Sequence, residues 1–90
     1  ALLVINDSLA IPNYNVACIY YKKAQDAMKQ AGVTYKQRLK NAQQYYRQCL
    51  PYMERYRKLV PQDTRLWYPV LYDTYLNLNM GKEFDSLPSL

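Results

Sequence analysis

Apolar side chains recur at alternating intervals of three and four residues along two long stretches of the chain. The stripe in the first stretch consists of Tyr14, Ala17, Tyr21, Ala24, Met28 and Ala31. The stripe in the second stretch consists of Tyr35, Leu39, Ala42, Tyr46, Cys49, Met53, Tyr56 and Val60. Because this spacing places the members of each stripe on one face of an α-helix, the pattern predicts helices over residues 11–30 and 34–60.

Local signals support these boundaries. Pro12 suits a first helical turn, Gly32 is a typical stop residue, and Thr34 is a typical N-cap. Since about three residues then connect the two helices, we expect them to lie antiparallel with their apolar stripes facing each other.

Pro51 falls inside the second predicted helix, where it removes one backbone hydrogen bond and crowds the preceding turn. The apolar stripe nevertheless keeps its phase on both sides of the proline. We therefore expect a kinked but continuous helix, and not two helices that break at Leu50. Val60 and Pro61 then end the helix.

The rest of the chain predicts a second, shorter pair of helices over residues 63–79 and 82–87. The apolar stripe of the first of these consists of Trp67, Leu71, Tyr75 and Leu78, with Val70 beside it. Pro69 either kinks this helix or delays its start. A turn separates the two helices, and Pro88 ends the second one.

The predicted fold class is all-α, because no segment alternates with a period of two. A long antiparallel helical hairpin (11–60) is followed by a short capping hairpin (63–87) in a single domain. Residues 1–8 are expected to be the tail of a preceding helix and its exit turn. No apolar run is long enough to span a membrane, so we expect a soluble chain, either cytoplasmic or exported.

Charge is concentrated in the middle of the chain. The 90 residues include 12 Lys or Arg and 7 Asp or Glu, which gives a net charge of +5. The stretch from Lys22 to Lys58 contains ten of the basic residues and two acids, Asp26 and Glu54. Such a basic centre suits an acidic protein, a nucleic acid or an anionic surface, although a solvated helical face gives the same pattern.

Two segments resemble the tetratricopeptide repeat family, including bacterial members with a proline in the second helix. In the run YNVACIYY, the family's large aromatic, Leu-Gly-like pair and second aromatic correspond to Tyr14, Ala17-Cys18 and Tyr21. In the run CLPYMERYRKLVP, the second-helix positions correspond to Cys49, Met53, Tyr56 and Pro61. Trp67 then stands where the next repeat's first aromatic belongs. The resemblance covers residues 10–87 and implies an α-α superhelix, of which this chain is the C-terminal part.

The chain departs from the family in length and in residue size. Residues 22–48 separate the two motifs, so both arms are extended by more than two turns. Tyr56 and Leu71 are large where the family usually has a small residue. The family's period of about 34 residues is therefore not visible.

The resemblance also implies a binding surface, because the first helix of each repeat lines a concave face that holds a peptide or an extended segment. The positions that match this face are Asn15, Ile19, Lys22, Lys23, Arg65, Tyr68 and Tyr72. Tyr68 and Tyr72 are four residues apart and share a helical face, and Tyr and Arg are enriched at binding hot spots. The alternative is that these side chains pack on a neighbouring helix or stand exposed without a partner.

The sequence offers little for catalysis. It has no histidine, no glycine-rich phosphate loop and only two cysteines, so we expect no enzyme activity, no metal site and no cofactor. Cys18 and Cys49 are equidistant from the turn predicted at residues 33–34, which places them level with each other on facing helices. They form either a disulfide or a pair of buried thiols.

These observations favour a non-catalytic scaffold that binds a protein or peptide, acidic or mixed in charge, on a concave helical face. A function from another class is the binding of nucleic acid or an anionic surface through the basic residues 22–58. Self-association through exposed helical faces is a third interpretation.

Overall fold

The computed structural model describes residues 9–88, and all regular elements within them are helices. In chain order these are α1 (Ala10–Met28), α2 (Tyr35–Leu59), α3 (Thr64–Asn77) and α4 (Gly81–Asp85). The all-α prediction is confirmed for this part of the chain. The helix tail predicted at residues 1–8 lies outside the described residues.

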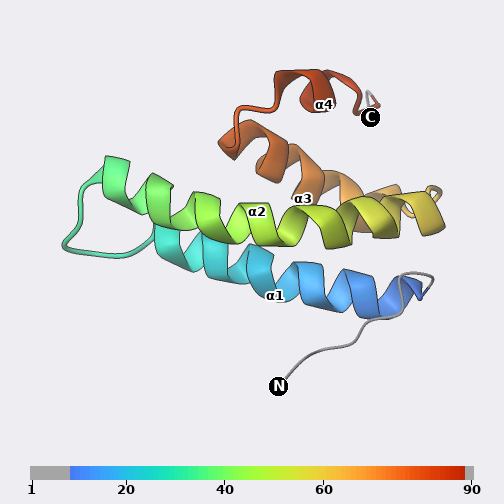
Figure 1. Cartoon of the computed structure of the whole chain (residues 1–90), viewed down its shortest axis with the longest axis horizontal. Helices are drawn as coiled ribbons and strands as arrows, with labels where there is room; N and C mark the ends of the chain where they lie inside the picture. Colours follow the sequence, from blue (N-terminus) through green and yellow to red (C-terminus); the bar gives the residue numbers. More distant parts are fainter. Residues whose placement is uncertain (1–8, 89–90) are drawn as a thin grey trace.

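α1 and α2 lie side by side, and the chain reverses direction between them (Figure 1). Their contact is lined by small, fully buried residues, which are Ala17, Ala24, Ala42 and Cys49. Because these side chains are small, the two helix axes can approach closely, and the larger buried side chains of Tyr46 and Met53 fill the space around them. The central parts of the two predicted stripes are therefore buried as expected.

The ends of both stripes next to the turn are predicted wrongly. α1 ends at Met28, so Ala31 belongs to the turn and is exposed. Tyr35 is the first residue of α2 and is 63% exposed, because α1 stops before it can cover this end of α2. Gly32 has a φ angle of 82°, a left-handed conformation that glycine adopts without strain.

α2 is one continuous helix through Pro51, as the unbroken stripe predicted. Pro51 is exposed, so its ring does not displace core side chains. A proline inside a helix costs about 3 kcal/mol, and the full burial of Cys49 and Met53 on either side offsets this cost. At the start of α2, the Thr34 hydroxyl accepts a hydrogen bond of 3.2 Å from the backbone N–H of Gln37, which confirms the predicted N-cap.

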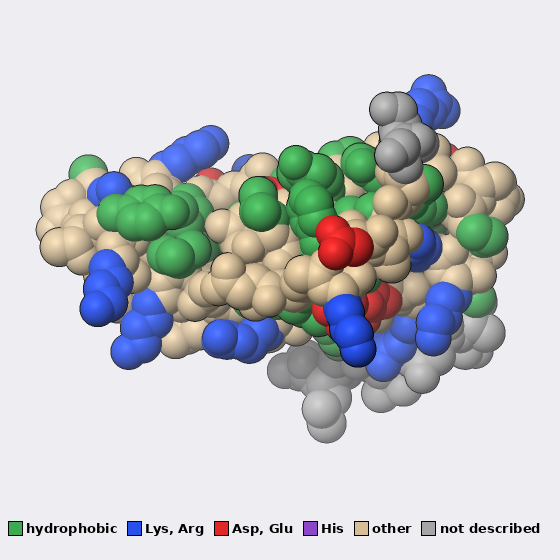
Figure 2. Space-filling view, turned by 90° about the horizontal axis from the view of Figure 1, so that it is seen from above, with side chains coloured by type: hydrophobic (Ala, Val, Ile, Leu, Met, Phe, Trp, Pro, Cys, Tyr) green, Lys and Arg blue, Asp and Glu red, His purple; other side chains and the backbone are tan. Residues whose placement is uncertain are grey.

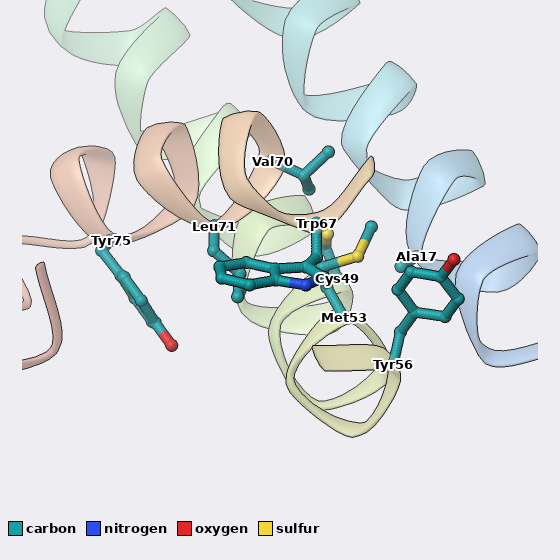
Figure 3. Packing of buried hydrophobic residues seen from close by; sticks show 8 residues of the cluster. All are labelled: Ala17, Cys49, Met53, Tyr56, Trp67, Val70, Leu71 and Tyr75. Atoms are coloured by element: carbon teal, nitrogen blue, oxygen red, sulfur yellow. The ribbon is translucent and has the colours of Figure 1, made fainter. Parts of the chain in front are cut away.

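α3 packs on α2 and completes the core. Its buried residues Trp67, Val70, Leu71 and Tyr75 form one cluster with Ala17, Cys49, Met53 and Tyr56 (Figure 3). The indole N–H of Trp67 donates to the backbone carbonyl of Pro61 over 3.2 Å, which fixes the connection between α2 and α3. α3 begins at Thr64 and runs through the exposed Pro69, so its start is not delayed.

α4 folds back beside α3, where the centres of the Phe84 and Tyr72 rings are 4.8 Å apart. α3 and α4 cover only part of the α1–α2 pair, and the part next to the 29–34 turn projects beyond them (Figure 1). We call residues 22–45, which include this projecting part, the distal end; within it, Gln43 donates to the backbone carbonyl of Asn77 at the end of α3. The rest of the pair, which packs against the length of α3, is the proximal end.

Candidate functional site

Three helices are joined at Asp73, a half-buried carboxylate on α3. The hydroxyl groups of Tyr21 on α1 and Tyr46 on α2 donate to Asp73 Oδ2 over 3.1 and 3.0 Å. Asn77 Nδ2 donates to Asp73 Oδ1 over 3.0 Å. Hydrogen bonds to a charged acceptor are stronger than neutral ones, so this carboxylate fixes α3 on the α1–α2 pair.

Two further tyrosines donate to carboxylates in the same way. The Tyr56 hydroxyl donates to Asp63 Oδ2 over 2.8 Å, and the Tyr75 hydroxyl donates to Glu54 Oε2 over 2.7 Å. Burial, together with the neighbouring carboxylate, raises the pKa of both Tyr21 and Tyr56 to about 12. These hydroxyl groups therefore remain protonated donors near neutral pH, where they serve the packing of the helices.

A row of three rings, one exposed and two half-buried, lies on α3 and α4. The ring centres of Tyr68 and Tyr72 are 6.1 Å apart, and Phe84 continues the row beyond Tyr72. We call Tyr68, Tyr72 and Phe84 the aromatic surface. Its rings border a hollow of about 230 Å³ together with Asp85, Leu87 and Pro88. Tyr72 is 42% exposed, and Figure 2 shows hydrophobic side chains exposed over α3 and α4.

The predicted groove residues do not line one shared hollow. Tyr68 and Tyr72 border the hollow beside α4, whereas Lys23 lines a different hollow of about 490 Å³ between α1 and α2. In that second hollow, Lys23 Nζ lies 5.9 Å from the centre of the Tyr45 ring. The other four predicted residues are exposed, and they are Asn15, Ile19, Lys22 and Arg65. A single groove shared by α1 and α3 remains a prediction.

Phe84 and Tyr45 were not predicted as members of these surfaces. Phe84 lies in the short helix predicted over residues 82–87, but the pattern did not indicate that this helix folds back on Tyr72. Tyr45 lies beside the stripe residue Tyr46, and nothing in the stripe indicated that its ring meets Lys23.

Both cysteines are free thiols. Cys49 is fully buried in the core cluster, and the half-buried Cys18 packs against the same cluster. Burial raises the pKa of the Cys49 thiol to about 12. Since the thiolate is the reactive form, Cys49 acts here as a small packing residue.

The described residues contain neither a metal-ligand cluster nor a membrane-spanning helix. Within residues 9–88, no three His, Cys, Asp or Glu side chains are grouped so that they could hold a metal ion. Among the four helices, none is both long enough and apolar enough to cross a bilayer.

No protein-family model, curated protein or solved structure matches the chain.

Proposed function

We propose that this chain is a non-catalytic interaction module that binds a peptide or protein segment, acidic or mixed in charge. The aromatic surface is the observation that carries the proposal. Tyr72 stays 42% exposed although it lies between two other rings and beside a hollow. Exposed aromatic side chains next to a hollow supply large contact area at little entropic cost, and such residues often dominate binding energy.

We further propose that the helices follow the superhelical arrangement of tetratricopeptide repeats. Cys18 on α1 and Cys49 on α2 stand at two of the family's small positions. Cys49 is fully buried in the core cluster, and the half-buried Cys18 packs against the same cluster. Trp67, at the place of the next repeat's first aromatic, is buried in the same cluster. In such an arrangement α1 and α3 line the concave face that is left for a partner, which agrees with the exposure of Ile19 and Arg65.

The titratable groups whose pKa values the fold changes most all serve packing, which agrees with the proposed absence of catalysis. Buried hydroxyls donate to carboxylates from Tyr21, Tyr46, Tyr56 and Tyr75. The Cys49 thiol is held protonated by burial. A general base or a nucleophile would need the opposite change, a pKa close to the working pH.

The proposal can be tested by selecting, from a library of displayed peptides, those that bind the intact chain. For a selected peptide, Tyr72→Ala should weaken binding by about 2 kcal/mol, or roughly thirtyfold in Kd, because it removes the central ring of the surface. The matched control is Tyr35→Ala, which removes a tyrosine that is 63% exposed at the distal end and should change Kd less than about twofold. Equal affinities of Tyr72→Ala and the unmodified chain would reject the aromatic surface as the binding site.

The second candidate function is binding of nucleic acid or an anionic surface through residues 22–58, which the exposed lysines of the distal end favour. A salt titration separates the two candidates. Nucleic-acid affinity should fall linearly in log–log form, with a slope of about −0.7 to −0.9 per phosphate contact. Binding of a peptide to the aromatic surface should change little with salt.

A further inference from the structure

The distal end carries the whole net charge of the chain. It contains six Lys or Arg and one acid, Asp26, so its net charge of +5 equals that of all 90 residues. Five of these basic residues are exposed lysines: Lys22, Lys23, Lys29, Lys36 and Lys40. In the described part of the chain, no salt bridge pairs any of the five with a carboxylate. Figure 2 shows Lys and Arg side chains around this end of the molecule.

A hollow of about 450 Å³ lies along the first turns of α2 at this end. Its lining comes from α2 and its N-cap alone, and consists of Thr34, Lys36, Gln37, Leu39, Lys40 and Gln43. The lining thus combines two unpaired lysines with two amides and includes no acid. The half-buried Leu39 adds an apolar part.

Each of the two glutamine side chains of this hollow uses its Nε2 atom as a hydrogen-bond donor to a neighbouring residue. Gln43 Nε2 donates to the backbone carbonyl of Asn77 over 2.8 Å, and because a carbonyl only accepts, the Gln43 Oε1 atom is left for another donor. Gln37 Nε2 donates to Asn41 Oδ1 over 2.9 Å. Among residues 9–88, no group donates to Oε1 of either glutamine.

We propose that this hollow binds an extended acidic segment of a partner protein. Lys36 and Lys40 lie one helical turn apart and pair with its carboxylates, while Gln37 and Gln43 accept hydrogen bonds from its backbone N–H groups. The phosphates of a nucleic acid match the lysines but cannot donate to the amide oxygens, for which only an RNA 2′-hydroxyl or a base edge offers a donor, whereas a polypeptide presents an N–H donor at nearly every residue. The chemistry of the hollow therefore fits a polypeptide better. This surface lies apart from the aromatic surface and does not depend on it.

Fluorescence anisotropy at low ionic strength tests the proposal with a labelled glutamate-rich peptide. The double charge reversal Lys36→Glu with Lys40→Glu should weaken peptide binding by about tenfold or more. The control is Lys58→Glu with Lys82→Glu, which makes the same change in net charge outside the hollow and should weaken binding less than about threefold. A peptide of the same charge with N-methylated backbone amides should bind several-fold more weakly, because it lacks the N–H donors.

Four results would overturn the proposal. They are absence of peptide binding, equal losses for both double variants, undiminished binding of the N-methylated peptide, and tighter binding of a single-stranded oligonucleotide of equal charge. The last result would instead support nucleic-acid binding. Peptide binding at this hollow should weaken as salt is added, whereas peptide binding at the aromatic surface should change little, so the outcomes for the two surfaces are separable.

Discussion

The two ends of the α1–α2 pair belong to the same helices but are held by different interactions. At the proximal end, α3 buries Met53 and Tyr56 in one cluster, and carboxylates accept hydrogen bonds from buried tyrosines. At the distal end, only the small side chains of Ala24 and Ala42 are fully buried, and the outer faces carry lysines without salt bridges in the described residues. Burial at one end thus stabilises the fold, which allows the other end to keep unpaired charge for solvent or a partner.

The largest expected contrast comes from truncating two leucines, one on α3 where it packs on the proximal end and one at the distal end. Leu71 is fully buried at the proximal end, so Leu71→Ala should lower the free energy of unfolding by about 2–5 kcal/mol. Leu39 is half-buried at the distal end, and Leu39→Ala should cost about 1 kcal/mol or less. Urea denaturation measures both. Equal losses would mean that the two ends contribute equally to stability.

A smaller contrast is expected for one carboxylate at each end. Asp73→Ala leaves the hydroxyl groups of Tyr21 and Tyr46 without an acceptor and should cost about 2–3 kcal/mol. Asp26 is exposed, so Asp26→Ala should change stability by less than about 0.5 kcal/mol. Urea denaturation at neutral pH compares the two variants, and a negligible effect of Asp73→Ala would show that this carboxylate does not hold α3 in place.

Alkaline pH should weaken the proximal end. The pKa values of Tyr21 and Tyr56 are about 12 in the folded chain, against about 10 in an unfolded one. The unfolded chain therefore releases these protons first, so their stabilisation is complete below pH 10 and is lost as pH rises from 10 towards 12. Urea midpoints across this range should fall, and Tyr21→Phe should reduce the fall whereas Tyr35→Phe should not. Midpoints that stay constant over the range would argue against buried, carboxylate-bonded phenols.

The smallest effects are expected from the distal charges. Lys36→Gln and Lys40→Gln should each change the free energy of unfolding by less than about 0.5 kcal/mol, because neither lysine is paired.

Hydrogen exchange should also be faster at Gln37 to Asn41 than at Cys49 to Met53, where α3 covers the helix. Equal protection of both segments would remove the distinction between the ends.

Much of the helical framework could be predicted from the sequence. The predicted range 34–60 agrees closely with the observed α2 from Tyr35 to Leu59. The agreement is close because the stripe shows how far the helix continues and the N-cap shows where it begins. The continuity of α2 through Pro51 was readable because the stripe keeps its phase there. The exposure of Tyr35 could not be predicted, since periodicity shows which face of a helix is apolar but not how far the neighbouring helix extends.

The surfaces were less predictable than the helices. The stripes indicated that Tyr21 and Tyr46 are inward-facing, but a hydrogen bond to Asp73 depends on how α3 sits on the pair. The contact between Tyr72 and Phe84 likewise depends on the direction of α4 after its turn. The basic stretch could be located by counting charges. The orientation of the Gln37 and Gln43 amides could not be predicted, because it depends on the partners of their Nε2 atoms, which no sequence pattern indicates.

The most direct test of the proposed interaction role is an NMR titration of the ¹⁵N-labelled chain with a peptide selected on it. The largest amide shift changes are predicted at Tyr68, Tyr72 and Phe84 on the aromatic surface, with small changes at Tyr35. Changes that instead concentrate on the outer face of α1, or that spread over the lysines of the distal end and vanish with added salt, would contradict the assignment of the aromatic surface as the binding site.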